Sequence, residues 1–188
     1  MKNIKELIKL GINLGIVCLI AALTLSATYS FTRDRIAYQK QLEVTNAQKS
    51  IFPDANFKKI DISGNESINR SIIDLYSAED SQNKEIGLIA IASTQGYSGP
   101  IFFVLGINTD GTIKDVRITE QTETPGLGAN ISKEKFIYQF KGKKSNDEFL
   151  VKKDIIPVTS ATISSKSISK GIKDATKYLM DRSWEKIK

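Results

Sequence analysis

The sequence predicts an α+β fold in which a single N-terminal transmembrane helix precedes one domain with an antiparallel sheet and flanking helices. Three observations predict it: an uncharged run over residues 10–32, four short segments rich in β-branched and aromatic residues over 71–119, and an apolar stripe with helical spacing over 168–179. The 188-residue chain has room for one ordinary domain and an appendage. A large multidomain enzyme is therefore excluded.

The uncharged run from Leu10 to Thr32 predicts a transmembrane anchor. As a helix these residues would extend about 34 Å, which is enough to cross the hydrocarbon core of a bilayer. Basic residues flank both ends: Lys2, Lys5 and Lys9 precede the run, and Arg33 and Arg35 follow it. A cleaved signal peptide is the alternative, but the run exceeds the roughly 7–15 apolar residues of a signal peptide, and LSATYS is a poor cleavage site. We therefore expect a retained anchor over 10–32 after a short tail over 1–9.

After the anchor, the sequence indicates a helix and then a series of strands. RDRIAYQKQLEVTNAQKSIFPD is typical of a helix that ends before Pro53, because the residue before a proline disfavours helical geometry. This places a connecting helix at 33–52 and the folded domain at 53–188. The strand segments are SIIDLYSA, EIGLIAIAS, PIFFVLGI and TIKDVRIT, and the turn sequences GYSG and NTDG punctuate them. We expect them to form an antiparallel meander over 71–119.

Two helices are expected after the sheet. The stretch SKEKFIYQF predicts a short one. In the C-terminal segment, Ile168, Ile172, Ala175 and Leu179 recur at i, i+4, i+7 and i+11, which places them on one helical face. That apolar stripe is expected to pack against the sheet.

Composition excludes several chemistries. The chain has no histidine, and its one cysteine, Cys18, lies in the apolar run, so we predict no metal site, no disulfide framework and no histidine-based catalytic residue. Any redox chemistry must then come from an organic cofactor.

The 27 Lys and Arg residues against 21 Asp and Glu residues give a net charge of +6 that is spread along the chain. This spread favours a solvated surface over a nucleic-acid interface.

PVTSATISSKS, residues 157–167, gathers hydroxyl groups at the start of the predicted C-terminal helix. The hydroxyl residues are Thr159, Ser160, Thr162, Ser164 and Ser165. They lie ahead of the first turn or within it, where unpaired N–H groups and the helix dipole favour an anion such as phosphate. The alternative is that one of the last two serines caps the helix, as serines near a helix start commonly do. Local spacing leaves both possibilities open.

TETPGLGAN, residues 122–130, predicts a tight loop where backbone can approach a flat ligand closely. Together with GYSGPI before it and TSATISS after it, this loop resembles, in order and spacing, the FMN-binding domain of the G subunit of Rnf-type ion-translocating ferredoxin:NAD oxidoreductases. The related C subunit of the sodium-pumping NADH:quinone oxidoreductase shares the pattern. The resemblance covers nearly the whole chain and includes the single anchor.

The resemblance implies a membrane flavoprotein that relays electrons as one subunit of an Rnf-like ion-translocating complex and completes no reaction alone. In this family the threonine of a Ser/Thr-Gly-Ala-Thr element is joined to the phosphate of FMN through a phosphoester, and the matching residue is Thr162, after Ala161. The resemblance implies further cofactor-binding residues in the same segments: Ser160, Ser164, Ser165, Glu123, Thr124, Gly126, Leu127, Gly128, Gly96 and Tyr97.

The same resemblance implies where the protein lies and what it meets. It places the chain in the cell membrane as a single-pass protein, with the tail in the cytoplasm and the domain on the extracytoplasmic side. The implied partners are other subunits of the complex, a flavin transferase that attaches the FMN, and membrane lipid. The chain departs from the family pattern at Ser160, where glycine is usual, and at Ile156, where an acidic residue often precedes the motif by six positions; Asp154 lies close by.

Two other functions fit parts of the sequence. SISK, from Ser167 to Lys170, matches the S-x-x-K pattern of serine acyl enzymes such as penicillin-binding proteins. The chain contains neither S-D-N nor K-T-G, and the domain is small for that fold, so the match carries little weight. A membrane-anchored scaffold without a cofactor is the other alternative, and flavin absorbance of the purified protein would distinguish it from a flavoprotein.

Overall fold

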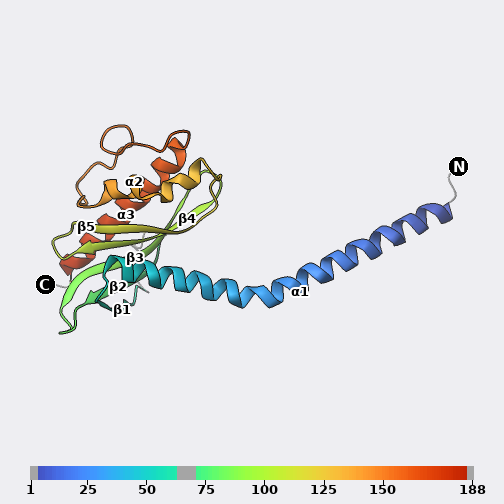
Figure 1. The fold of residues 1–188 in the computed structure, drawn as a ribbon, viewed down its shortest axis with the longest axis horizontal. Helices are drawn as coiled ribbons and strands as arrows, with labels where there is room; N and C mark the ends of the chain where they lie inside the picture. The colour runs from blue at the N-terminus through green and yellow to red at the C-terminus, as the bar shows by residue number, and fades with distance from the viewer. Residues whose placement is uncertain (1–3, 63–70, 186–188) are drawn as a thin grey trace. The chain divides into compact units, whose positions relative to one another are not determined.

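The computed structural model describes residues 4–62 and 71–185 and divides the chain into two compact units, residues 1–42 and 43–188. Helix α1 runs from Ile4 to Ile51, and only its last turns belong to the second unit (Figure 1). The predicted anchor over 10–32 is helical throughout, and α1 ends before Pro53 as predicted. The apolar side chains of the 10–32 segment are exposed, and the helix is long and apolar enough to cross a membrane.

The threonine hydroxyls of the anchor segment are satisfied within the helix. Thr24 Oγ1 donates a 3.0 Å hydrogen bond to Ile20 O, and Thr28 Oγ1 donates a 2.9 Å hydrogen bond to Thr24 O. Such bonds reduce the cost of placing a hydroxyl in a lipid environment, where water cannot serve as its partner.

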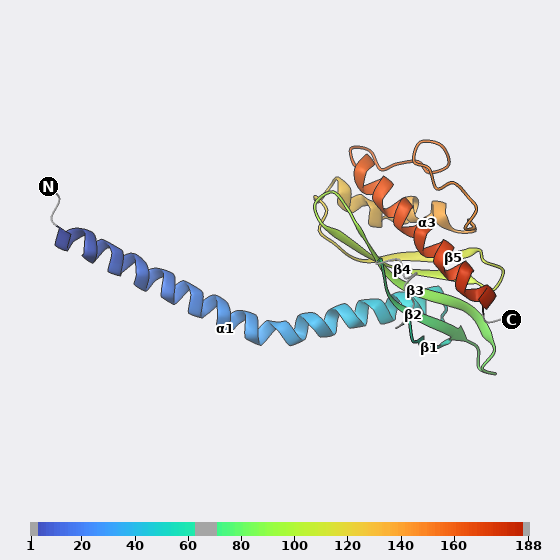
Figure 2. The same cartoon turned by 180° about the vertical axis from the view of Figure 1, so that it is seen from behind.

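The second unit is built on a five-stranded antiparallel sheet with the strand order β1-β2-β3-β4-β5 (Figures 1 and 2). The strands are β1 (Asn56–Ile60), β2 (Ile72–Glu79), β3 (Glu85–Gln95), β4 (Pro100–Asn108) and β5 (Ile113–Gln121). Strands β2 to β5 confirm the predicted meander. Strand β1 was not predicted, because NFKKI is short and its side chains are mostly exposed, so it carries little of the apolar pattern by which strands are recognised.

The two faces of the sheet carry separate apolar clusters. Alternate residues of β3 point to opposite faces: Leu88 and Ala90 join the larger cluster, whereas Ile89 and Ile91 join the smaller one. The larger cluster packs beneath helix α3 (Thr162–Glu185), which lies across the sheet in Figure 2. The smaller cluster is completed by three residues at or just after the end of α1, namely Ala47, Ile51 and Phe52.

The helical segments after the sheet differ partly from the prediction. The single short helix expected over SKEKFIYQF is two pieces, α2 (Glu134–Ile137) and the 3-10 turn η2 (Tyr138–Phe140), and another 3-10 turn, η1 (Gly128–Ser132), precedes them. The predicted C-terminal stripe is confirmed, because Ile168, Ile172, Ala175 and Leu179 of α3 are all fully buried.

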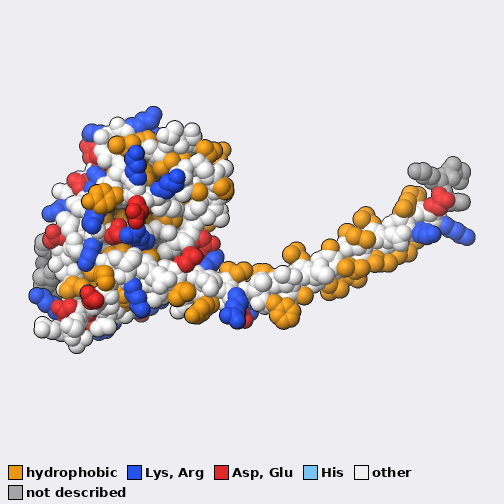
Figure 3. Space-filling view, in the orientation of Figure 1, with side chains coloured by type: hydrophobic (Ala, Val, Ile, Leu, Met, Phe, Trp, Pro, Cys, Tyr) orange, Lys and Arg blue, Asp and Glu red, His pale blue; other side chains and the backbone are white. Residues whose placement is uncertain are grey.

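The surface of the two units differs in character. In Figure 3 the side chains along α1 are mostly hydrophobic, whereas basic and acidic side chains are interspersed over the visible face of the domain. Interspersed charge of both signs is typical of a solvated surface and not of a dense anion-binding patch.

Candidate functional site

A buried carboxylate joins the three segments that the sequence analysis singled out. Glu123, in the loop after β5, is only 4% exposed. Its Oε1 accepts a 3.0 Å hydrogen bond from the Ser98 N–H in the β3–β4 turn, and its Oε2 accepts a 2.5 Å hydrogen bond from Ser164 Oγ at the start of α3. The structure therefore brings the three predicted segments together, and the buried carboxylate of Glu123 links its own loop to the other two segments by hydrogen bonds.

Two of the predicted site glycines make room for this carboxylate. A Cβ added to Gly96 would overlap Glu123 Oε1 and would lie 2.8 Å from Ile101 Cδ1. A Cβ added to Gly128 would lie 2.6 Å from Glu123 Oε2 and 3.0 Å from Ser164 Oγ. Any side chain at either position would push Glu123 out of place, so these glycines serve the packing of the buried carboxylate.

The tip of the loop faces outward. Gly126 has a φ of +78°, which L-residues rarely adopt, and a Cβ there would meet nothing within 4 Å. Asn130 Nδ2 donates a 2.7 Å hydrogen bond to Gly126 O and fixes the turn. Thr124 is exposed, and the Leu127 side chain is 45% exposed. The tip thus offers open backbone and an accessible apolar side chain next to it.

The hydroxyls at the start of α3 divide into two groups. Those of Ser164 and Ser165 are buried and bonded: the former donates to Glu123, and the latter donates to Ala161 O at 2.9 Å and accepts from the Val158 N–H at 3.0 Å. The hydroxyls of Ser160 and Thr162 make no hydrogen bond to any described residue, and Ser160 is exposed while Thr162 is half-buried. No described hydrogen bond has either buried serine accepting from a first-turn N–H, as a helix cap would, so the two serines hold neighbouring segments in place instead.

The backbone gives a reason for the glycine that the resemblance implies at position 160. Ser160 has a φ of +62°, in the left-handed region that favours glycine. The chain turns there to enter α3, and the first helical hydrogen bond runs from the Ser165 N–H to Ala161 O at 2.9 Å. The N–H groups of Thr162, Ile163 and Ser164 precede that bond, so they are first-turn donors without an intrahelical partner.

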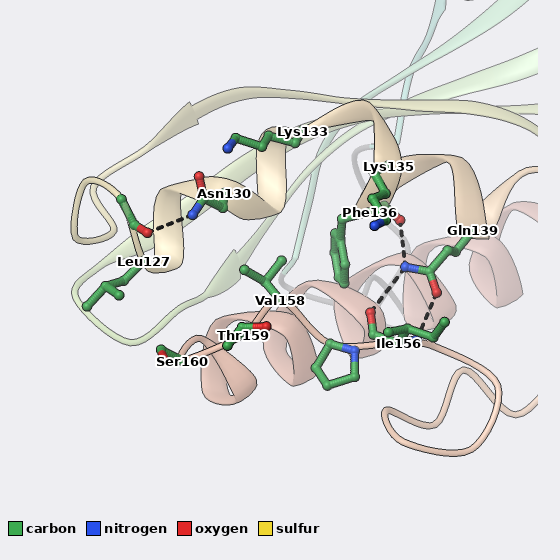
Figure 4. A pocket seen from close by; sticks show the side chains of 12 residues that line it. Leu127, Asn130, Lys133, Lys135, Phe136, Gln139, Ile156, Val158, Thr159 and Ser160 are labelled. Atoms are coloured by element: carbon green, nitrogen blue, oxygen red, sulfur yellow. Dashed lines mark hydrogen bonds between the residues drawn. The ribbon is translucent and has the colours of Figure 1, made fainter.

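A cavity of about 620 Å³ lies beside this turn, between η1–α2 and the segment from Ile156 to Ser160 (Figure 4). Gln139 joins the two walls, because its Nε2 donates to Ile156 O at 3.1 Å and its Oε1 accepts from the Ile156 N–H at 2.8 Å. The lining residues are Gly126, Leu127, Asn130, Lys133, Lys135, Phe136, Gln139, Ile156, Pro157, Val158, Thr159 and Ser160. Most of these were absent from the sequence prediction, because nothing local distinguishes the polar face of a short helix from an ordinary solvated face.

The remaining predicted residues lie outside the cavity lining. The Tyr97 side chain is 68% exposed in the β3–β4 turn. Ser167 and Lys170, the pair of the serine acyl enzyme alternative, lie further along α3, where Ser167 O accepts a 3.3 Å hydrogen bond from Thr94 Oγ1 and Lys170 is exposed. Neither residue lines this cavity, and Thr162 does not line it either, although Thr159 and Ser160 just before it do.

Comparison with known proteins agrees with this architecture. Residues 96–177 match the FMN-binding domain family, and residues 1–51 match the RnfG N-terminal region. The chain is 35% identical over 172 residues to the G subunit of the proton-translocating ferredoxin:NAD(+) oxidoreductase complex of Clostridium ljungdahlii, and the alignment covers 89% of this chain and 88% of that protein. It is 29% identical over 186 residues to the G subunit of the Na(+)-translocating ferredoxin:NAD(+) oxidoreductase complex of Acetobacterium woodii, with 89% of each chain covered. Among solved structures, Shewanella oneidensis NqrC shares the fold, with a TM-score of 0.52, 17% identity, and 71% of this chain and 70% of that chain covered.

Proposed function

Because the chain belongs to the RnfG family, the G subunits of Rnf-type ion-translocating oxidoreductase complexes, we propose that it relays electrons inside such a complex through an FMN joined to Thr162 by a phosphoester. FMN supplies one- or two-electron transfer when bound, which lets one site connect neighbouring redox centres. The protein's task is then to hold the cofactor and to set its environment.

The free hydroxyl of Thr162 is the observation that carries the attachment site. Among the hydroxyls in the first turn of α3, those of Ser164 and Ser165 are already bonded, whereas Thr162 Oγ1 has no partner among the described residues. A phosphodiester at that oxygen would carry negative charge beside the first-turn N–H groups, which favour an anion. Ser160 also has a free hydroxyl, but it precedes the helix, and the family pattern points to Thr162.

The loop tip and the cavity fit the rest of such a cofactor. Gly126 and Leu127 offer open backbone and an apolar side chain to a flat ring, and Thr124 lies in the same turn. The cavity volume of about 620 Å³ is within the range of small-molecule sites. We propose that four buried residues hold the three segments in place beneath the cofactor, namely Glu123, Gly128, Ser164 and Ser165. We further propose that Gly96 and Tyr97 belong to the β3–β4 turn that this packing fixes.

The long apolar helix α1 supports a membrane-anchored protein. We propose that residues 1–9 form a cytoplasmic tail, that 10–32 cross the membrane, that 33–52 continue as a connecting helix, and that 53–188 form the FMN-binding domain on the extracytoplasmic side. The other subunits of the complex are its partners, since its relatives are named as subunits. We further propose contact with membrane lipid along α1 and with a flavin transferase at the Thr162 turn.

Intact-mass analysis of the denatured full-length chain tests the attachment. Protein made together with a flavin transferase should carry the mass of one FMN less one water, and Thr162→Ala should remove both this mass and the flavin fluorescence of the denatured band. Ser160→Ala is the matched control and should keep the label, whereas Thr162→Ser should keep part of it, because the oxygen remains while the rotamer is less fixed. Label that persists in Thr162→Ala would place the attachment elsewhere.

A further inference from the structure

The end of α1 packs into a slot that two glycines leave on the sheet. Gly87 of β3 and Gly106 of β4 are diagonal neighbours, because Ile89, two residues after Gly87, lies directly opposite Gly106. A Cβ added to Gly106 would overlap Cγ2 of Ile51, which is only 2% exposed. A Cβ added to Gly87 would lie 2.5 Å from Cζ of Phe52, which is only 1% exposed. Glycine at both positions therefore lets the end of α1 approach the backbone of the sheet closely.

A lysine from a third strand holds Phe52 in this slot. Lys114 Nζ of β5 lies 4.0 Å from the centroid of the Phe52 ring, within the range of a cation–π interaction. The Phe52 N–H also donates a 3.0 Å hydrogen bond to Gln48 O, which extends the helical bonding one residue past the end of α1. Residues 43–52 belong to the same compact unit as the sheet. The end of the anchor helix is thus part of the domain core.

Strands β3 and β4 carry the slot at one end of their hairpin and the β3–β4 turn at the other. Their register runs over 87–95 and 100–108 without a shift, whereas the β2–β3 and β4–β5 pairings each contain irregularities. Residues 87–95 span about 26 Å as a strand, at about 3.3 Å per residue. In the turn, the Ser98 N–H bonds Glu123, the carboxylate that also bonds the first turn of α3. The hairpin therefore connects the end of the anchor helix to the attachment turn.

We propose that Gly87 and Gly106 are positioning residues that fix the end of α1 to the sheet, and that the β3–β4 hairpin is a rigid arm that holds the attachment turn at a set distance from that end. The inference rests on the proposed function, because it assigns the arm to a membrane anchor and a flavin. The rate of electron transfer depends steeply on the separation of the redox centres. A relay protein therefore gains from a cofactor held on regular structure in place of a flexible linker.

Double electron–electron resonance measures this distance in the full-length chain, purified in detergent. Spin labels are placed at two exposed positions of the same unit through Asn46→Cys and Lys170→Cys, in a Cys18→Ser background. Gly106→Ala should broaden the distance distribution about twofold, because the added Cβ displaces Ile51. Ile51→Ala in the same chain removes the overlapping atom and should narrow the distribution again.

A second variant tests the joint without adding atoms to the core. Lys114→Met keeps an apolar stem and removes the charge over the Phe52 ring. Amide hydrogen exchange in the peptide that spans 47–52 should become about threefold faster. Lys177→Met, at an exposed position on α3, is the matched control and should leave that exchange unchanged. Thermal unfolding of each variant identifies any change that comes from loss of fold.

The outcomes separate the arm from the flavin attachment. In the assembled complex, Gly106→Ala should keep covalent FMN and the flavin midpoint potential but lose part of the ferredoxin:NAD oxidoreductase rate. A distance distribution as narrow in Gly106→Ala as in the wild type would overturn the joint. A broadened distribution together with an unchanged rate would overturn the positioning role. Wild-type protein without covalent FMN would overturn the proposed function and, with it, the assignment of the arm to a flavin.

Discussion

Ser164 Oγ donates a 2.5 Å hydrogen bond to Glu123 Oε2, and this one contact joins the first turn of α3 to a loop 41 residues earlier in the chain. The other oxygen of the same carboxylate accepts from the Ser98 N–H. The first turn of α3 is therefore tied to a buried side chain that belongs to another segment. A buried carboxylate with both oxygens bonded is costly to disturb, because each donor would lose its partner away from water.

Glu123→Gln should loosen this connection. The amide keeps the size of the side chain but places an NH2 group where one acceptor oxygen was. Either the Ser98 N–H then faces a donor, or the charge-assisted bond from Ser164 Oγ is replaced by a weaker neutral one in which the hydroxyl accepts. We expect the free energy of unfolding to fall by about 1–3 kcal/mol and the yield of covalent FMN to fall with it. Denaturant unfolding and intact mass measure the two effects. Glu134→Gln, at an exposed position, is the control; equal stability of the two variants would contradict the structural role of Glu123.

Gly126→Val should strain the loop tip. There is space for the added side chain, so the penalty comes from the φ of +78°. We expect a loss of about 1–2 kcal/mol in unfolding free energy and a shifted flavin absorbance spectrum and potential, since the tip borders the cavity. Gly126→Asn is the matched control, because asparagine tolerates left-handed backbone better than valine. Identical spectra and stability in the valine variant and the wild type would reduce the loop to an ordinary surface turn.

Gln139→Leu should release the wall segment before Thr162. The substitution keeps an apolar stem but removes both hydrogen bonds to the Ile156 backbone. We expect faster amide hydrogen exchange in the peptide that spans 156–160, with little change in the strands. Gln139→Glu keeps the acceptor for the Ile156 N–H and loses the donor to Ile156 O, so its exchange rate should be intermediate. Exchange that is equal in all three proteins would show that the pairing does not hold this wall.

Asp154 gives the stability a dependence on acid pH. Burial alone would raise the pKa of this carboxyl, but the hydrogen bond and charge of Lys143, 2.9 Å away, together with backbone N–H groups, outweigh burial and hold the pKa below its ordinary value of 3.8. A lowered pKa in the folded state contributes stability that is present above the ordinary value and is lost as pH falls through the folded pKa. Asp154→Asn should therefore show a smaller loss of stability than the wild type below about pH 4. Parallel pH profiles for the two proteins would contradict this assignment.

The fold could be predicted from the sequence where a repeating pattern of apolar residues exists. The stripe from Ile168 to Leu179 and the continuous apolar run of β3 both indicate buried residues. Strand β1, by contrast, has five mostly exposed residues and depends on pairing with β2. The anchor follows from its length without charge. The C-terminal stripe, strand β3 and the anchor depend mainly on residues close in sequence, so they can be predicted from local sequence patterns.

The candidate site could be predicted only in part. Sequence spacing places Thr162, Ser164 and Ser165 in one turn but cannot tell which hydroxyl is free, because that depends on Glu123 from a distant loop. The cavity lysines were missed for the same reason, since the opposite wall comes from a segment about 20 residues further along the chain. The left-handed backbone at Ser160 gives a physical reason for the glycine that the family pattern has at that position.

The order in which the strands pair has a consequence for biogenesis. Each strand of the sheet pairs with its neighbour in the chain, so the meander can form from local contacts while synthesis continues. Helix α3, which begins at Thr162, follows the sheet in the chain, and its Ser164 supplies the hydrogen bond to Glu123 Oε2. A truncated chain would lack the helix that covers the larger apolar cluster and would leave Glu123 half-bonded. If FMN is attached at Thr162 as proposed, the label would therefore be added only to chains in which synthesis has passed the sheet and reached α3.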